Sequence, residues 1–211
     1  MEQSTHAHPR VGEKAPGFRL AAAGGGEVAL SDYLGARNPL LWFSKGLFCP
    51  FCRRNMARLS QVYPEFVALD AEVLQITHNT PQEANAYFRN YHLATPYLCD
   101  ADRSVHSAYG VALERQSLGA MADNWVTSSA MVVHDLVMNG EKSPAPLPAL
   151  RMGSFQPAQL VVAVDRAGVV RYVWSGGPFD TLPTVAELLS LLQSMRAEPE
   201  PEAGPGVALS H

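Results

Sequence analysis

The sequence lacks the features that mark secreted and membrane-spanning proteins. It has only three cysteines in 211 residues, an odd and low number that does not suit a secreted disulfide framework. No apolar run approaches the roughly 20 residues that a membrane helix needs. The N-terminal residues 1–14 are polar and contain no hydrophobic stretch of the signal-peptide type. We therefore expect a cytoplasmic protein that does not enter a membrane.

A strong net charge is also lacking. Lysine and arginine number 16 against 20 aspartate and glutamate, which gives a net charge of -4, and these charges are scattered along the chain. Such a balance offers no attraction to nucleic acid or to anionic lipid. Hydrophobic residues make up 47% of the chain, enough for the core of one domain.

The two ends of the chain differ from its middle. Residues 197–211 are rich in proline, glutamate and glycine and cannot bury enough apolar area to offset their ordering entropy. We expect disordered tails at 1–10 and 197–211 and one folded domain at 11–196. Within it, residues 112–156 lack a clear hydrophobic period, which indicates an insertion or an excursion over the active-site side.

The remaining segments predict an α/β fold, because strands alternate with helices along much of the chain. Gly24 to Gly26 form the turn of an expected N-terminal hairpin, and a second hairpin is expected near the C-terminus. The expected strands are 18–20, 27–30, 40–43, 72–76, 97–99, 160–164 and 169–174, and the expected helices start near 50, 80, 102 and 184.

The helix that follows strand 40–43 is the best defined. Pro50 suits its first position, where a missing N–H costs nothing, and Pro64 should kink it or end it early. Its apolar residues recur at helical spacing: Cys52, Met56, Leu59, Tyr63 and Phe66. The pair Cys49 and Cys52 therefore lies where a buried strand meets a helix.

Cys49 is the candidate nucleophile. At a helix N-terminus, free backbone N–H groups and the helix dipole favour thiolate over thiol. Lys45 and Arg53 are the candidates for further support of the negative charge, and Trp42 and Phe48 for an apolar wall around it. Thiol groups in such places have a pKa between roughly 3.5 and 7.5.

Cys52 is the candidate resolving residue, because it lies in the first helical turn within reach of Cys49. Half of a zinc site is the alternative, but no second pair accompanies the cysteines except His6 and His8 in the expected tail. We therefore expect neither a metal nor a cofactor. Cys99, beside apolar residues, is more typical of packing than of chemistry.

Several segments of the chain together match the pattern of one known family: Val11 to Phe18, Phe48-Cys49-Pro50, Ala71 to Leu74, Asp100 to Val111 and Val164 to Val170. Through these segments the chain resembles the peroxiredoxin-like AhpC/TSA (redoxin) family of the thioredoxin-fold superfamily. The resemblance implies a central mixed β-sheet flanked by helices, with the insertion before the last hairpin. It also implies attack of Cys49 on a peroxide, a thiol reductant such as thioredoxin, glutaredoxin or glutathione, and it allows a homodimer.

The sequence departs from the family pattern around Cys49. The pattern has proline seven residues and threonine or serine three residues before the reactive cysteine, where this chain has Trp42 and Gly46. An arginine expected at the start of the penultimate strand aligns with Gln159, so Arg151, and after it Lys45, are the candidate substitutes. Without these donors we expect peroxide to be reduced slowly.

Cys49-Pro50-Phe51-Cys52 is instead similar to the dithiol motif of glutaredoxin and thioredoxin. In that superfamily a cis proline packs beside the disulfide, and Pro157 is the candidate for this role, with an ordinary loop proline as the alternative. Three functions remain open: a thiol peroxidase, a protein dithiol-disulfide oxidoreductase, and a redox-sensing binding module with 112–156 as its partner surface.

Overall fold

The computed structural model describes most of the expected domain. The described residues are 7–47, 49–89, 93–115, 155–176 and 182–197, together with the single positions 119, 126, 130 and 137. The expected C-terminal tail, apart from Ala197, and most of the expected insertion lie outside them. At the N-terminus, the His8 ring nitrogen Nδ1 lies 3.0 Å from the Tyr109 carbonyl oxygen and Pro9 is buried. The chain therefore joins the fold before residue 11, earlier than expected.

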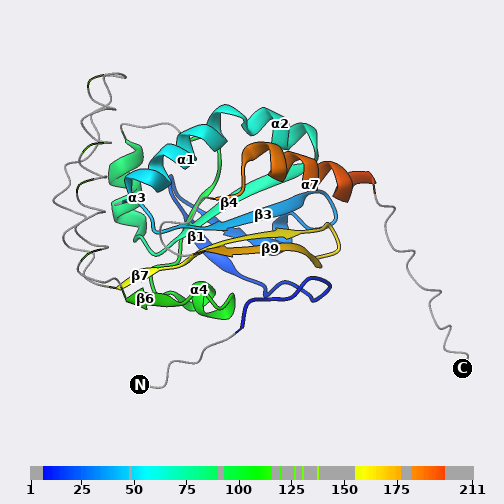
Figure 1. The fold of residues 1–211 in the computed structure, drawn as a ribbon, viewed down its shortest axis with the longest axis horizontal. Coiled ribbons are helices and arrows are strands. Elements are labelled where there is room, and N and C mark those ends of the chain that lie inside the picture. The colour runs from blue at the N-terminus through cyan, green and yellow to red at the C-terminus, as the bar shows by residue number, and fades with distance from the viewer. Residues whose placement is uncertain are drawn as a thin grey trace, which may run out of the picture.

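A mixed seven-stranded sheet forms the centre of the molecule (Figure 1), in the order β2-β1-β5-β4-β3-β8-β9. Strands β3, β4 and β5 run parallel to one another, and the pairs β1–β2, β1–β5, β3–β8 and β8–β9 are antiparallel. The strand bounds are β1 Arg19–Ala22, β2 Glu27–Ala29, β3 Asn38–Phe43, β4 Ala71–Thr77, β5 Tyr97–Cys99, β8 Gln159–Val164 and β9 Val170–Gly176. Both expected hairpins are confirmed.

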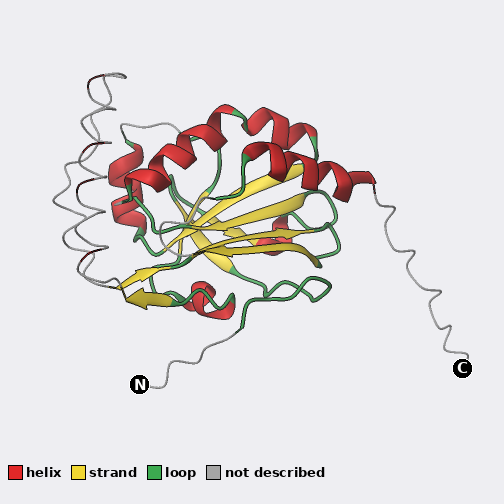
Figure 2. Ribbon diagram, viewed as in Figure 1, coloured by secondary structure: helices red, strands yellow, loops and turns green. Residues whose placement is uncertain are grey.

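Helices cover both faces of the sheet (Figure 2). Helices α1, α2 and α7 lie along one face and α4 lies on the other. Their bounds are α1 Pro50–Gln61, α2 Tyr63–Ala68, α3 Pro81–Phe88, α4 Ser104–Ala108 and α7 Val185–Ala197, with a short 3-10 helix at Leu30–Asp32. In the described part of the chain, no helix combines the length and apolar character that crossing a bilayer requires.

Local signals explain where the helices begin and end. Thr80 caps α3 in a reciprocal box with Glu83, and Thr184 and Glu187 exchange the same bonds at the start of α7. The predicted break at Pro64 is confirmed, because α1 ends at Gln61 and Pro64 lies in the first turn of α2.

Strand β3 precedes the loop that leads to Cys49. Every residue from Asn38 to Phe43 is buried, because β4 and β8 flank the strand and side chains pack on both of its faces. Leu40 and Trp42 belong to the cluster under α1 and α7, and Leu41 and Phe43 belong to the cluster on the α4 side. The continuous apolar run thus reflects a strand buried on both faces, as predicted.

The region 112–156 is bracketed by a small separate ladder. Strand β6, Leu113–Arg115, pairs antiparallel with β7, Phe155–Pro157. Pro157 is therefore the last residue of β7, opposite Leu113, and the described residues contain no cis peptide bond. The cis form suggested for Pro157 is wrong: the residue ends a strand in the ordinary trans form.

Candidate active site

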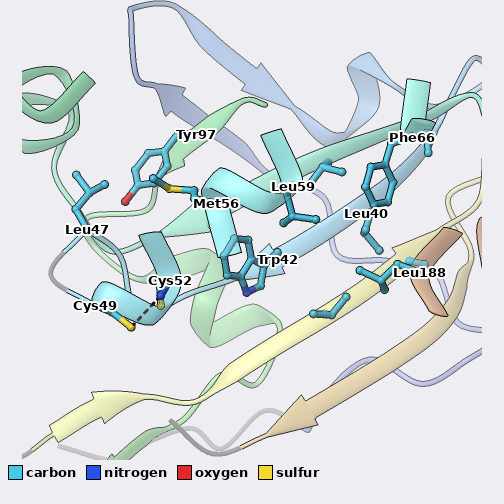
Figure 3. Packing of buried hydrophobic residues seen from close by; sticks show 14 of the residues in the cluster. Leu40, Trp42, Leu47, Cys49, Cys52, Met56, Leu59, Phe66, Tyr97 and Leu188 are labelled. Atoms are coloured by element: carbon cyan, nitrogen blue, oxygen red, sulfur yellow. Dashed lines mark hydrogen bonds between the residues drawn. The ribbon is translucent and has the colours of Figure 1, made fainter. Parts of the chain in front are cut away.

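Cys49 lies between β3 and α1, directly before the first residue of the helix (Figure 3). It is the N-cap of α1, with extended backbone angles, and Pro50 occupies the first helical position. The parallel strands β3 and β4 both end at this edge of the sheet, the edge where α/β proteins place their binding sites. The predicted strand-to-helix placement of both cysteines is confirmed.

The Cys49 sulfur is held as a hydrogen-bond acceptor. The Cys52 backbone N–H donates to Cys49 Sγ at 3.2 Å, and only 7% of Cys49 is exposed. The hydrogen bond from the Cys52 thiol, the charge of Lys45 and the backbone N–H groups of Cys52 and Phe51 outweigh burial and lower the pKa of Cys49 to about 7. The thiolate is therefore well populated at neutral pH.

Cys52 has the opposite environment. It is 1% exposed, and burial together with the hydrogen bond to Cys49 raises the pKa of its thiol well above the ordinary value. The two residues therefore divide into a thiolate acceptor and a protonated donor. This is the division that an attacking and a resolving cysteine require.

The two candidate cations differ in their surroundings. Lys45 is 2% exposed and lies in the loop between β3 and α1, and its charge lowers the pKa of Cys49. Arg53 is half-buried in the first turn of α1, where its backbone N–H donates to the Cys49 carbonyl at 3.1 Å. Its side-chain role remains a prediction.

We expect the alkylation rate of Cys49 to rise with pH and reach half its maximum at about pH 7, because only the thiolate reacts. Lys45→Met removes the positive charge at similar volume and should move this midpoint upward, toward the free-thiol value of about 8.5. Arg53→Gln, the matched control in the same loop-to-helix segment, should move it less. Iodoacetamide labelling followed by peptide mass spectrometry measures the rate at Cys49 itself. An unchanged midpoint in Lys45→Met would contradict the role of Lys45.

The loop before Cys49 is fastened by Asn79, which the sequence did not single out. Asn79 Oδ1 accepts from the Leu47 backbone N–H at 3.0 Å and from the Tyr97 hydroxyl at 2.8 Å, while its amide nitrogen donates to Glu83 at 3.2 Å. Gly46 makes this approach possible: its φ is +86°, and a Cβ there would overlap Asn79 Oδ1. Asn79 lies three residues after the end of the predicted strand 72–76, and this position was the one available signal.

Ser44 does not replace the hydroxyl missing at residue 46. Its Oγ accepts from Gln75 Nε2 at 3.0 Å and lies 3.4 Å from the Gly46 backbone nitrogen. The hydroxyl is thus already engaged by β4 and by the backbone of Gly46. The departure from the family pattern at Gly46 is thus accompanied by a different fastening of the loop, through Asn79.

Cys99 lies in β5, paired with Ala21 and Thr77, and is 5% exposed. Burial, with a smaller effect of Glu83, raises the pKa of its thiol to about 11. Both observations favour the packing role. We expect Cys99→Ser to leave the rate of Cys49 oxidation unchanged, as measured by stopped-flow fluorescence. A disulfide between Cys49 and Cys99 in the oxidised protein would contradict this.

A buried acid–histidine pair supports the same edge of the sheet. Asp100, directly after β5, lies 2.5 Å from His106 Nδ1 of α4 and also accepts the His106 and Val105 backbone N–H groups. The His106 ring packs edge-on against Phe43 at the end of β3, with 5.3 Å between ring centroids. The pair thus fastens α4 to the end of the central strand.

The other predicted site residues lie beneath α1, at the start of β8 or outside the described chain. Trp42 packs beneath α1 in the same buried cluster as Cys49 and Cys52 (Figure 3), and Gln159 is the first residue of β8, as expected. Arg151 and Phe48 lie outside the described residues. Within the described segments, no three histidine, cysteine or acidic side chains gather as a metal site would require.

Comparison with known proteins finds a matching family and related thiol enzymes. The model of the AhpC/TSA family matches residues 11–173. The Mycobacterium tuberculosis protein Rv2521, named as a peroxiredoxin, is 29% identical over 135 residues, which cover 64% of this chain and 84% of that protein. The thiol-disulfide oxidoreductase ResA of Geobacillus thermodenitrificans is 30% identical over 102 residues, 48% of this chain and 58% of that protein.

Solved structures confirm the expected α/β thioredoxin-like fold. The crystal structure of peroxidoxin BcpB from Mycobacterium tuberculosis superposes with a TM-score of 0.59 at 18% identity and covers 90% of this chain and 98% of that one. Reduced 2-Cys peroxiredoxin from Plasmodium vivax gives a TM-score of 0.62 at 17% identity, over 88% of this chain and 81% of that one.

Proposed function

Because the chain belongs to the AhpC/TSA family, we propose that it is a thiol peroxidase in which Cys49 attacks a hydroperoxide and Cys52 resolves the product. The family and its relatives make the protein a thiol-based oxidoreductase. The observation that carries the assignment of roles is the contact between the two cysteines: it is the largest cause that lowers the pKa of Cys49 to about 7, and it adds to burial in raising the pKa of Cys52.

The reaction follows from these two protonation states. The Cys49 thiolate attacks the terminal oxygen of hydrogen peroxide or an organic hydroperoxide, the O–O bond breaks, and the leaving oxygen takes a proton to become water or an alcohol. Cys49 is then a sulfenic acid. The Cys52 thiol loses its proton and attacks the Cys49 sulfur, which releases water and closes a disulfide. An external thiol, such as thioredoxin, glutaredoxin or glutathione, returns two electrons. Such reductants favour the cytoplasm as the compartment.

We expect this site to reduce peroxide more slowly than a site that has all the residues of the family pattern. Residue 46 offers no hydroxyl, and Gln159 stands where the family has an arginine. Loss of one donor to a developing oxyanion commonly costs on the order of 10² to 10³ in rate. The buried cation Lys45 partly offsets this loss, because it acts on the thiolate in a poorly solvated loop.

A second function, protein dithiol-disulfide exchange, is favoured by one specific feature. Cys49 and Cys52 occupy the N-cap and the third residue of α1, the arrangement of a dithiol that passes electrons to a partner disulfide. The likeness to ResA supports the same reading. The same two residues would act in the same order, with a partner's sulfur in place of the peroxide oxygen.

One experiment separates the two functions. The reduced protein is mixed with one equivalent of hydrogen peroxide or cumene hydroperoxide, and its oxidation is followed by stopped flow and then by peptide mass spectrometry. A peroxidase forms a Cys49–Cys52 disulfide much faster than free cysteine reacts with the same peroxide. Oxidation at the rate of a free thiol, together with rapid insulin disulfide reduction, would replace the proposal with the second function.

A further inference from the structure

The loop 44–47, which leads from β3 toward Cys49, is held at its two ends in different ways. Its first residue continues the sheet, because the Ser44 N–H donates to the Ile76 carbonyl at 3.1 Å. Its last residue depends on a side chain, because the Leu47 N–H donates to Asn79 Oδ1 at 3.0 Å. All four residues of the loop are buried and Asn79 is 1% exposed, so water does not compete for this bond.

The Asn79 amide is fixed in one orientation. Its Nδ2 donates to Glu83 at 3.2 Å, and its Oδ1 also accepts from the Tyr97 hydroxyl at 2.8 Å, which points toward Leu47 in Figure 3. A flipped amide would present a donor to the Leu47 N–H and an acceptor to the Glu83 carboxylate, and both bonds would be lost. Thr80, the N-cap of α3, follows directly. Asn79 therefore holds the loop from a position between two regular elements, β4 and α3.

The loop held in this way carries Lys45. Lys45 is 2% exposed, and its charge is one of the causes that lower the pKa of Cys49, after the hydrogen bond from the Cys52 thiol. Burial raises the pKa of Cys52, and the charge and backbone N–H of Lys45 oppose that rise. One loop residue thus acts on both sulfurs. A displacement of the loop would weaken both effects, because a charge acts less across a greater distance and through more water.

We propose that Asn79 is a positioning residue for the two cysteines: by holding the Leu47 N–H it keeps the loop, and with it the positive charge of Lys45, close to their sulfurs. Gly46 serves the same contact, because a Cβ there would overlap Asn79 Oδ1. The inference rests on the proposed function only for its meaning in catalysis. Its electrostatic part applies to any thiol chemistry at this site and is measurable without peroxide.

A double-mutant cycle between Asn79 and Lys45 tests the proposal. The full-length reduced protein is labelled with iodoacetamide at about pH 6, where the rate at Cys49 is proportional to its thiolate fraction and a change in pKa appears directly as a fold change. Lys45→Met should slow this labelling by about ten-fold when Asn79 is present. In the Asn79→Ala background it should slow labelling by no more than about three-fold, because the loop no longer holds the charge in place. Peptide mass spectrometry gives the rate at Cys49 itself.

Two other backgrounds serve as controls. Asn85→Ala removes an asparagine that fastens a different turn, since Asn85 Oδ1 accepts the Gly24 N–H at 2.6 Å, and the effect of Lys45→Met should stay at about ten-fold. Asn79→Asp/Glu83→Gln exchanges the amide and the carboxylate, so that an acceptor for the loop and the net charge are both kept. This exchange should restore the full effect of Lys45→Met.

Asn79→Ser provides a second background if Asn79→Ala does not fold, because its hydroxyl is too short to reach Leu47 and binds water instead. The proposal is overturned if Lys45→Met has the same fold effect with and without Asn79, or no effect in either. An exchange variant that behaves like Asn79→Ala overturns it as well. So does an equal reduction in Asn85→Ala, since this would indicate a general loosening of the fold. None of these outcomes depends on whether the protein reduces peroxide, which the stopped-flow experiment decides separately.

Discussion

Cys49→Ser removes single-turnover oxidation by peroxide, whereas Cys52→Ser retains the first step and accumulates a sulfenic acid at Cys49. The asymmetry follows from the protonation states: Cys49 is the acceptor with a pKa of about 7, and Cys52 is the buried donor whose pKa is raised. Stopped-flow fluorescence gives the rate of the first step. Dimedone labelling with mass spectrometry identifies the sulfenic acid.

A second variant, Cys52→Ala, tests the hydrogen bond between the two side chains. The serine of Cys52→Ser keeps a hydroxyl donor, whereas Cys52→Ala removes the largest of the interactions that lower the pKa of Cys49 and leaves the two backbone N–H groups and Lys45. In Cys52→Ala the first step should therefore slow most at low pH and recover as pH rises through the new pKa. Equal loss in Cys49→Ser and Cys52→Ser at every pH would mean that Cys52 takes part in the attack, and the assignment of roles would fail.

Gly46→Thr restores the family's hydroxyl in the sequence but should damage the protein rather than speed it up. A side chain at a φ of +86° costs about 1–2 kcal/mol. The new Cβ would also overlap Asn79 Oδ1 and lie 3.2 Å from its Cγ. Displacing Asn79 leaves the Leu47 N–H and the Tyr97 hydroxyl without an acceptor, at about 1–3 kcal/mol for each buried group. Urea unfolding and stopped-flow oxidation should both show large losses.

The chain offers a matched control for backbone strain. Gly35 has a φ of +82°, and a Cβ there meets nothing within 4 Å, so Gly35→Ala carries the strain without the overlap. Gly46→Ala should therefore lose clearly more stability than Gly35→Ala. Asn79→Ala should remove part of the extra cost when combined with Gly46→Ala, which makes the double variant non-additive. Equal losses of stability in Gly46→Ala and Gly35→Ala would show that the Asn79 side chain moves aside at little cost.

Local chemistry made much of the fold predictable. Pro50, Pro64 and the Thr80–Glu83 capping box act within one helical turn, so their effects can be deduced from neighbouring residues. The apolar run in β3 likewise indicated a strand buried on both faces. The position of Cys49 between them, and the direction of its pKa shift, followed from the same local signals.

Contacts between distant segments were not predictable in this way. The Gly46–Asn79 approach joins residues 33 positions apart, and it depends on the register in which β3 and β4 run side by side. Pro157 is an error of another kind, because the prediction rested on a superfamily analogy and not on local signals. The analogy suggested a cis peptide bond, but Pro157 pairs with Leu113 at the end of a strand and its peptide bond is trans.

The position of Cys49 as the N-cap of α1 limits how another protein can distinguish the reduced from the oxidised form. Cys49 and Cys52 are already joined across the first turn of α1 by an N–H to sulfur contact, so a disulfide replaces one short link by another without unwinding the turn. We therefore expect amide hydrogen exchange along α1 to be the same in the reduced and oxidised protein. A partner that discriminates the two forms must therefore contact the sulfur atoms themselves, because oxidation changes the bonding of the sulfurs and leaves the backbone of α1 unchanged.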